Sequence, residues 1–412
     1  MCITPPNNDP CLQPPRQLRA TVIPSPVKRG PRVRPRWIEC AFIRLSAPPR
    51  RLISTYSRVG HARSSYILFH HSALHTAAVG PPGRASVFCR RAGCQGSAKP
   101  RPVSPVSPYP AGSGRSPALR DVRPGPPKRS IYDAGGSEIL PGKLVREESE
   151  PASGDQSADE AYDGLGHTHR LFADIFGRNS IDGEGLPLDA TVHFGKLYDN
   201  AFWDGHQMVF GDGDGEVFER FTRSLSVIGH ELTHGVTQYS AGLAYRNQAG
   251  AINESMSDVF GALVEQYLNS QSVTDASWLI GEGLFTPQVQ GSALRSLKAP
   301  GTAYDDDVLG KDPQPDSMDS YVRTSADNGG VHINSGIPNR AFYLTAETLG
   351  GNAWEAPGRI WYDALTGGSL PATATFRVFA TATAASAVGL YGNDSPEHDA
   401  VRQAWETVKV KL

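Results

Sequence analysis

The segment 229–236, which reads GHELTHGV, holds two histidines and a glutamate at a spacing that suits a metal ion. His230 and His234 are four positions apart, so on a helix both imidazoles leave one face and can bind a single ion. Glu231 lies one position further round, near enough to an open coordination position to accept a proton from water there. By itself, this motif fits a pair of surface histidines as well.

A third ligand comes twenty residues after His234, where Glu254 lies in the segment NESMSD. A catalytic zinc ion usually takes three protein ligands and leaves a fourth position for water, and two histidines with one carboxylate supply that set. Asp258 lies four residues beyond Glu254, on the same helical face, where it can accept a hydrogen bond from a ligand histidine. An ordinary acidic helix face is the alternative for this segment alone. Together, the two segments predict one Zn²⁺ bound by His230, His234 and Glu254.

Apolar spacing predicts the elements that position these residues. The histidines are expected on a helix over 221–236, because Leu225, Ile228, Leu232 and Val236 repeat at helical spacing. Further helices are expected over 157–176, 341–346, 360–365 and 397–408, and strands over 131–145, 191–194, 200–203 and 207–210. A polar loop rich in Asp and Pro is expected over 299–320.

Four separated segments resemble one known family. The residues 230–261 resemble the zinc centre of the thermolysin family, of the gluzincin type. In chain order, 200–205 resemble the family's substrate-binding edge strand, 211–215 the turn after it, and 327–336 the segment with a second catalytic histidine. The resemblance covers about 129–412 and is nearest to the shorter, protealysin-like members.

The resemblance implies an α+β fold, a thermolysin-like catalytic domain of two lobes with the zinc helix at the cleft between them. The β-rich N-terminal lobe is expected over 129–237, including the zinc helix, and the helical C-terminal lobe over 238–412. It also implies a zinc-dependent endopeptidase in which Glu231 is the general base and Tyr245 and His332 stabilise the oxyanion. A plain core tyrosine and a structural turn histidine are the alternatives for these last two residues.

Positioning roles are implied for residues beside the ligands. Asp327 is expected to orient His332, and Asn253 and Asp258 are expected to orient the zinc ligands. A catalytically inactive zinc-bearing scaffold is the alternative function, although such a scaffold is expected to lack a base or an oxyanion donor.

The resemblance also implies how a substrate binds. An extended peptide can add to an exposed sheet edge through main-chain hydrogen bonds. Asn200, Ala201 and Trp203 belong to the matching edge strand, and Arg295 matches the arginine that binds the carbonyl just after the cut. Positions at or near the family's primary pocket are apolar, which implies cleavage on the amino side of bulky hydrophobic residues, although such apolar residues more often belong to a core than to a pocket. These positions are Phe218, Phe221, Val227 and Leu294.

Calcium binding departs from the pattern of thermolysin itself. Glu265 and Glu282 match two of five carboxylates in a double calcium site, and the other three places hold Ser226, Ser277 and Leu279. Calcium takes about six to eight oxygen ligands, usually several carboxylates among them. A double site is therefore not expected, and one Ca²⁺ near Glu265 and Glu282, supported by Asp275, stays an open alternative.

Charge divides the chain near residue 129. Residues 1–129 hold 22 Lys and Arg against 3 Asp and Glu, while the rest hold 18 against 39. The first part also holds 22 of the 33 prolines and all five cysteines, whose spacing indicates no disulfide framework. Residues 1–128 are therefore expected to be largely disordered rather than a folded domain.

Three interpretations of residues 1–128 stay open. They are a pro-segment, a basic arm that binds nucleic acid or acidic surfaces, or a sequence translated in the wrong reading frame. For the acidic catalytic part we expect protein or peptide substrates and no nucleic acid, because it would repel a phosphate backbone. No apolar run approaches about 18 residues, so no membrane span is expected. The first thirty residues show no recognisable signal peptide, and secretion is implied by the resemblance alone. We expect a monomer.

Overall fold

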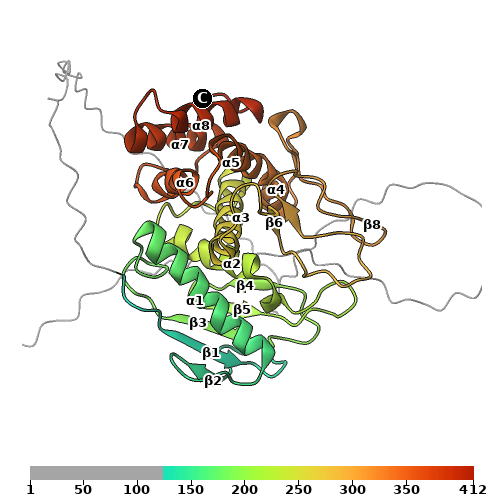
Figure 1. Ribbon diagram of the computed structural model, residues 1–412. Coiled ribbons are helices and arrows are strands. Elements are labelled where there is room, and N and C mark those ends of the chain that lie inside the picture. The colour runs from blue at the N-terminus through green and yellow to red at the C-terminus, as the bar shows by residue number, and fades with distance from the viewer. Residues whose placement is uncertain (1–123) are drawn as a thin grey trace, which may run out of the picture. The chain divides into compact units, whose positions relative to one another are not determined.

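The computed structural model describes residues 124–412, which begin with a mixed sheet and continue into packed helices (Figure 1). The predictions of disorder and of a basic arm over 1–128 lie almost wholly outside the described residues. Figure 1 shows the sheet and its covering helix α1 at one end of this part and the last helices at the other, with α3 between them. The α+β fold expected from the sequence is confirmed.

The sheet has five strands in the order β2-β1-β3-β5-β4. Its strands are β1 (Arg129–Asp133), β2 (Lys143–Glu147), β3 (Leu188–Val192), β4 (Ala201–Trp203) and β5 (Met208–Phe210). The three inner strands run parallel, and β2 and β4 pair antiparallel at the two edges. The prediction of a strand over 191–194 was two residues too late at its end, because His193 adopts a left-handed φ of 54° that ends β3.

Helix α1 (Gln156–Phe176) packs across the sheet. It begins where the Asp155 carboxylate accepts a hydrogen bond from the Ala158 amide, and it ends at Gly177 with a φ of 63°. Tyr162, Leu165 and Phe172 lie on its buried face, as their spacing predicts. On the other face of the sheet a small apolar cluster gathers Phe194, Phe202, Val209, Leu140 and Tyr198.

The next helices, α2 (Leu225–Gln238) and α3 (Asn247–Asn269), form the closest helix pair among the described elements. Two glycines allow this approach: a Cβ on Gly261 would lie 2.3 Å from the Ser226 carbonyl oxygen, and one on Gly229 would lie 3.0 Å from the Gly261 Cα. The predicted helix over 221–236 begins too early, because Ser224 is extended and separates a short 3₁₀ turn, η1 (Phe221–Arg223), from α2.

The remaining chain is mainly helical, as expected. Its helices are α4 (Asp327–Asn334), α5 (Gly336–Leu349), α6 (Ala356–Thr366), α7 (Phe376–Tyr391) and α8 (Pro396–Thr407). The predicted helical segments 341–346, 360–365 and 397–408 fall within α5, α6 and α8, with α8 ending one residue earlier. Helices α4 and α7 were not predicted.

Two short strand pairs precede these helices: β6 (Leu279–Ile280) with β7 (Arg295–Ser296), and β8 (Asp305–Asp306) with β9 (Gly310–Lys311). The second pair and a 3₁₀ turn, η2 (Met318–Ser320), lie within the predicted loop 299–320. Among residues 124–412, none of the helices combines the length and the apolar character that crossing a membrane requires. The lobe boundary at 237/238 stays a prediction.

Candidate active site

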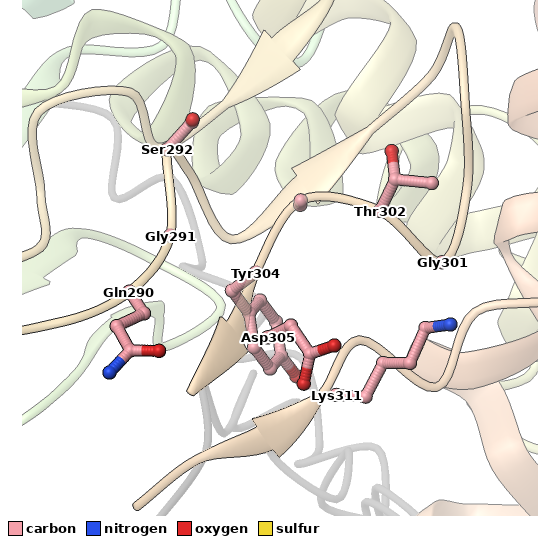
Figure 2. A pocket seen from close by; sticks show the side chains of 9 residues that line it. Gln290, Gly291, Ser292, Gly301, Thr302, Tyr304, Asp305 and Lys311 are labelled. Atoms are coloured by element: carbon pink, nitrogen blue, oxygen red, sulfur yellow. The ribbon is translucent and has the colours of Figure 1, made fainter. Parts of the chain in front are cut away.

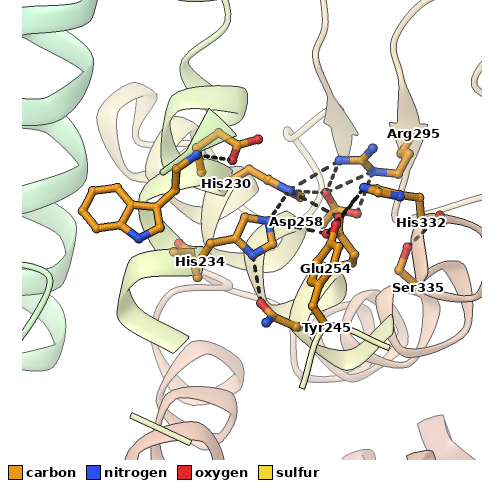
Figure 3. A network of polar contacts seen from close by, with 12 residues as sticks. His230, His234, Tyr245, Glu254, Asp258, Arg295, His332 and Ser335 are labelled. Carbon is orange, nitrogen blue, oxygen red and sulfur yellow. Dashed lines mark hydrogen bonds and ion pairs between the residues drawn. The ribbon is translucent and has the colours of Figure 1, made fainter. Parts of the chain in front are cut away.

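Helices α2 and α3 bring two imidazoles and a carboxylate to one point (Figure 3). The Nε2 atoms of His230 and His234 lie 3.0 Å apart. The Glu254 carboxylate, from α3, lies 3.4 Å from the first of these nitrogens and 3.5 Å from the second. All three side chains are fully buried.

These separations fit a tetrahedral zinc ion. With bonds of about 2.0–2.1 Å, the ligand atoms of such an ion lie about 3.3 Å from one another. The ligand atoms of Glu231 also lie within 4.8 Å of those of both histidines. The shorter distances of Glu254 favour it over Glu231 as the third ligand, and one oxygen of Glu231 already accepts a hydrogen bond from the Trp203 main-chain N–H at 3.2 Å.

Hydrogen bonds on the far side of each ring decide which nitrogen would bind a metal ion. His230 Nδ1 lies 2.8 Å from the Asp258 carboxylate, and His234 Nδ1 lies 2.8 Å from the Asn253 side-chain oxygen. Both partners are acceptors in this arrangement, so each Nδ1 carries a proton and each Nε2 is the atom left for a metal ion once it is deprotonated. The structure therefore places Asp258 and Asn253 beside the rings that the sequence expected them to orient.

Burial shifts the pKa values of all three residues of the motif. It raises the pKa of Glu231 to about 8 and lowers the pKa of His234 to about 4. Burial also opposes a charge on His230, but hydrogen bonds to Asp258 and Glu254 outweigh it and raise the pKa of His230 to about 9. A cation bound to His230 competes for the same lone pair as that proton.

Tyr245 and His332 lie beside the Glu254 carboxylate (Figure 3). The Tyr245 hydroxyl donates to Glu254 and lies 3.0 Å from His332 Nε2. His332 Nδ1 lies 2.5 Å from one oxygen of Asp327, and the other oxygen accepts the His332 main-chain N–H at 2.8 Å. Both predicted oxyanion donors and the predicted orienting carboxylate thus meet at the metal-binding group.

The main chain of β4 faces the same group. The Asn200 carbonyl accepts from Gly211 and the Asp204 amide donates to Gln207, so these residues direct their main-chain groups toward β5. Because strand residues alternate, Ala201 and Trp203 direct theirs to the opposite side. The hydrogen bond from the Trp203 amide to Glu231 agrees with that direction.

Only the main chain of Trp203, and not its side chain, is placed to contact a peptide at the β4 edge. The indole is 1% exposed, packs against Gly235 and donates to the Gln238 side chain at 3.1 Å. Any contact of Trp203 with a peptide on this edge is therefore a main-chain contact. Asn200 and Ala201 are also buried, at 6% and 0% exposure.

Arg295 and Asn339 both hold Asp258. The Arg295 guanidinium donates to this carboxylate from Nε at 2.9 Å and from Nη2 at 2.7 Å. Asn339, from α5, donates to it at 2.8 Å. Sequence reasoning expected Arg295 only at the substrate, and it missed Asn339, which carries no motif and lies 81 residues from its partner.

Comparisons with known proteins agree with this geometry. Residues 114–238 match the family model of the thermolysin metallopeptidase catalytic domain, and 241–410 match the alpha-helical domain of the same metallopeptidases. The extracellular metalloprotease of Pectobacterium carotovorum subsp. carotovorum is 56% identical over 288 residues, which cover 70% of this chain and 82% of that protein. The chain belongs to the thermolysin family.

Two further relatives agree with this assignment. Protease PrtS of Photorhabdus sp. (strain Az29) is 50% identical over 286 residues, covering 69% of this chain and 76% of that protein. The solved precursor of protealysin, a metalloproteinase from Serratia proteamaculans, matches with a TM-score of 0.69 and 56% identity, covering 70% of this chain and 89% of that chain. With its zinc-binding motif intact, this thermolysin-family chain is a metalloendopeptidase that acts on protein substrates.

The calcium alternative stays a prediction for this family member. Glu265 is partly buried and Glu282 is exposed. Burial raises the pKa of Glu265, a hydrogen bond with Ser226 opposes that rise, and the negative charge of Glu282 adds to it. Asp275 accepts hydrogen bonds from the amide and hydroxyl of Ser272, which makes it part of a local turn.

The pocket drawn in Figure 2 lies apart from the metal-binding group. It has a volume of about 380 Å³ and is lined by 290–292, 301–305 and Lys311. None of these residues belongs to the group around His230. The convergence of chemically competent side chains, rather than the pocket, marks the active site.

Proposed function

We propose that this metalloendopeptidase depends on zinc and cleaves peptide bonds on the amino side of bulky hydrophobic residues. The observation that carries the proposal is the meeting of His230, His234 and Glu254, whose ligand atoms lie within 3.5 Å of one another beside Glu231. His230, His234 and Glu254 hold the ion, and Asp258 and Asn253 orient the two rings. The chemistry that bound zinc supplies is polarisation of the scissile carbonyl and a lowered pKa for the attacking water.

Glu231 is the general base in this proposal. One of its oxygens is held by the Trp203 amide, and the other accepts no hydrogen bond among the described residues. That oxygen can take a proton from water and then pass it to the leaving amine. Burial raises the Glu231 pKa to about 8, so the residue holds a proton more readily than an exposed glutamate, while a nearby cation favours the carboxylate.

Tyr245 and His332 stabilise the oxyanion that forms when the carbonyl is attacked. Both lie beside the Glu254 carboxylate, Tyr245 from the connection between α2 and α3 and His332 from α4, and the Tyr245 hydroxyl lies 3.0 Å from His332 Nε2. Asp327 accepts a hydrogen bond from Nδ1 of His332, so Nε2 is the atom that meets the substrate, and it donates when the ring is an imidazolium with both nitrogens protonated. Fixed donors at the site of developing charge are among the largest contributions to catalysis.

The substrate adds to β4 as a further strand. The outward main-chain groups of Ala201 and Trp203 offer hydrogen bonds to any sequence, with Asn200 and Arg295 as further contacts. The preference for bulky hydrophobic residues is supported by Val227, one turn before His230, and Leu294, next to Arg295. Both are apolar and buried, with exposures of 0% and 3%.

Cleavage of matched peptides by the full chain tests this function. Peptides with Leu, Phe or Asp after one scissile bond would be compared, with and without a zinc chelator. We expect chelator-sensitive cleavage before Leu and Phe and little before Asp. Bound zinc without cleavage of any peptide would favour the inactive scaffold, and cleavage that ignores the chelator would overturn the zinc mechanism.

We further propose that the protein is exported, since a relative that is 56% identical bears the name extracellular metalloprotease. We also propose that it acts as a monomer, with lobes over 129–237 and 238–412. A pro-segment role or nucleic-acid binding by residues 1–128 concerns a part of the chain that is almost wholly outside the described residues.

A further inference from the structure

The main-chain carbonyl of His332 is held by two side chains, those of Gln314 and Ser335. The Gln314 amide donates to this carbonyl at 2.8 Å, and the Ser335 hydroxyl donates to it at 3.0 Å. Gln314 also donates to the Ser335 hydroxyl at 2.9 Å, which completes a small ring of hydrogen bonds. Figure 3 shows Ser335 beside His332.

The orientation of the Gln314 amide is set by its partners. A carbonyl oxygen can only accept, so the nitrogen of the amide must face His332. Gln314 is 5% exposed, and its Oε1 accepts no hydrogen bond among the described residues. A buried amide oxygen without a partner destabilises a fold. The hydrogen bonds of Gln314 are therefore those that its NH₂ group donates, to the His332 carbonyl and the Ser335 hydroxyl.

The loop that carries Gln314 is itself fixed. One oxygen of the Asp312 carboxylate accepts a hydrogen bond from the main-chain N–H of Gln314 at 3.0 Å. The other oxygen accepts from the main-chain N–H groups of Gly301 and Ala303 at 3.0 and 3.1 Å. These three main-chain donors come from two segments, 301–303 and 314, so the Asp312 carboxylate ties the two segments together. Gln314 thus extends toward His332 from a rigid base.

A glycine allows this loop to reach α5. A Cβ on Gly336 would lie 2.5 Å from the Pro315 carbonyl oxygen and 3.0 Å from the Gln314 Cβ. The backbone of 314–315 therefore lies against the first residue of α5, only four residues after His332. The close packing and the hydrogen bonds independently connect this loop with the segment that carries His332.

We infer that Gln314 is a positioning residue for His332 in the proteolytic reaction. Asp327 holds the imidazole and the main-chain N–H of His332, and Gln314 with Ser335 holds its carbonyl, so both sides of the residue are fixed. The fixed main chain sets where Nε2 lies relative to the Tyr245 hydroxyl, 3.0 Å away. This inference rests on the proposed function, in which His332 donates to the oxyanion.

The test is Gln314→Met in the full chain, which keeps the side-chain length and removes the donor. We expect kcat to fall about tenfold, less than the ~100-fold or more for loss of a whole oxyanion donor. KM should stay within about twofold and zinc content should not change, because neither substrate strand nor ligands are touched. Gln290→Met, an exposed glutamine in the neighbouring region, is the matched control and should leave kcat unchanged.

A double-mutant cycle separates positioning from general damage. In a His332→Ala background, Gln314→Met should cause no further loss of kcat, because the group that it positions is gone. An equal tenfold loss in that background, or a loss of zinc, would overturn the inference. If Gln314→Met does not fold, Gln314→Asn retains the amide at a shorter reach and is compared in the same two backgrounds. Absence of chelator-sensitive cleavage by the unmodified chain would instead overturn the proposed function, and this inference with it.

Discussion

The helix pair that carries the metal ligands and the segment that carries His332 are built differently. Helices α2 and α3 are regular, and the buried His230, His234 and Glu254 project from them at helical spacing. Helix α4 instead contains consecutive residues with left-handed φ, from 48° at Asn328 to 92° at Gly329. It is held from outside itself: Asn247, at the start of α3, lies against Gly329, and Gln314 holds the His332 carbonyl.

This contrast indicates where each region is vulnerable. A regular helix determines the directions of its side chains, so the metal ligands need chiefly a close helix crossing. The backbone of an irregular turn does not fix the directions of its side chains in this way. The position of His332 therefore depends on hydrogen bonds, among them one from Gln314 in another segment. We therefore expect damage to the first region to affect metal binding or proton transfer, and damage to the second to affect turnover alone.

The largest expected effect is at Glu231, in the regular region. Glu231→Gln keeps the shape but removes the proton acceptor, so kcat should fall about 1000-fold. Because the amide still accepts the Trp203 hydrogen bond, zinc content should remain that of the unmodified chain. Steady-state kinetics and metal analysis check this, and retention of more than a tenth of the activity would exclude Glu231 as the base.

Removal of His332 is expected to have the next largest effect, in the irregular region. His332→Ala should lower kcat about 100-fold, as loss of one oxyanion donor does, with little change in KM. Zinc affinity, measured by competition with a chelator, should be unchanged, since His332 is not a ligand. A parallel fall in zinc affinity would show that the two regions are not separable.

The helix crossing itself is tested by Gly261→Ala. The added methyl would meet the Ser226 carbonyl oxygen at 2.3 Å, so the variant should lose about 1–3 kcal/mol of stability by overpacking. Zinc affinity should fall with it, because the crossing sets the distance between Glu254 and the histidines. Gly389→Ala is the control, since nothing lies within 4 Å of its added Cβ in helix α7; it should be neutral or stabilising by about 1 kcal/mol. Thermal unfolding of the pair distinguishes these outcomes.

The smallest effect concerns His193, which belongs to neither region. Hydrogen bonds to Asp212, opposed by burial, raise the pKa of His193 to about 9, and Asp155 adds to the rise. Because the pKa of His193 is higher in the folded chain than its value of 6.5 in the unfolded chain, the charged ring stabilises the fold. This stabilisation is fully present below pH 6.5 and is lost as the pH rises through about 9. His193→Gln should therefore cost about 1–2 kcal/mol at pH 6, after allowance for solvent screening, and almost nothing at pH 9.5.

Denaturant unfolding at the two pH values measures this difference. Cleavage at pH 6 and moderate temperature should be unaffected, because His193 contacts neither the ligands nor His332. An equal loss of stability at both pH values would show that His193 acts through packing and not through its charge.

Local spacing in the sequence was enough to predict several of the regular helices and the pairing of two candidate metal ligands on one helix face, although the regular helix α7 was missed. The four-residue interval of His230 and His234 predicted a shared helix face, and the apolar pattern predicted α1 and the buried face of α8. Such predictions succeed because the number of residues between two positions on a helix determines the directions in which their side chains point. The start of α2 and the end of β3 were missed, because single residues, Ser224 and His193, leave the regular backbone there.

The long-range contacts that complete the site could be found in the folded chain alone. Arg295 and Asn339 meet on Asp258, and Gln314 meets the His332 carbonyl, across 37, 81 and 18 residues of sequence. Nothing in their local sequence requires these contacts, since a buried amide or guanidinium needs partners but does not specify them. Close packing of the kind that Gly336 allows beside Gln314 brings such partners together, and close packing is a property of the whole fold.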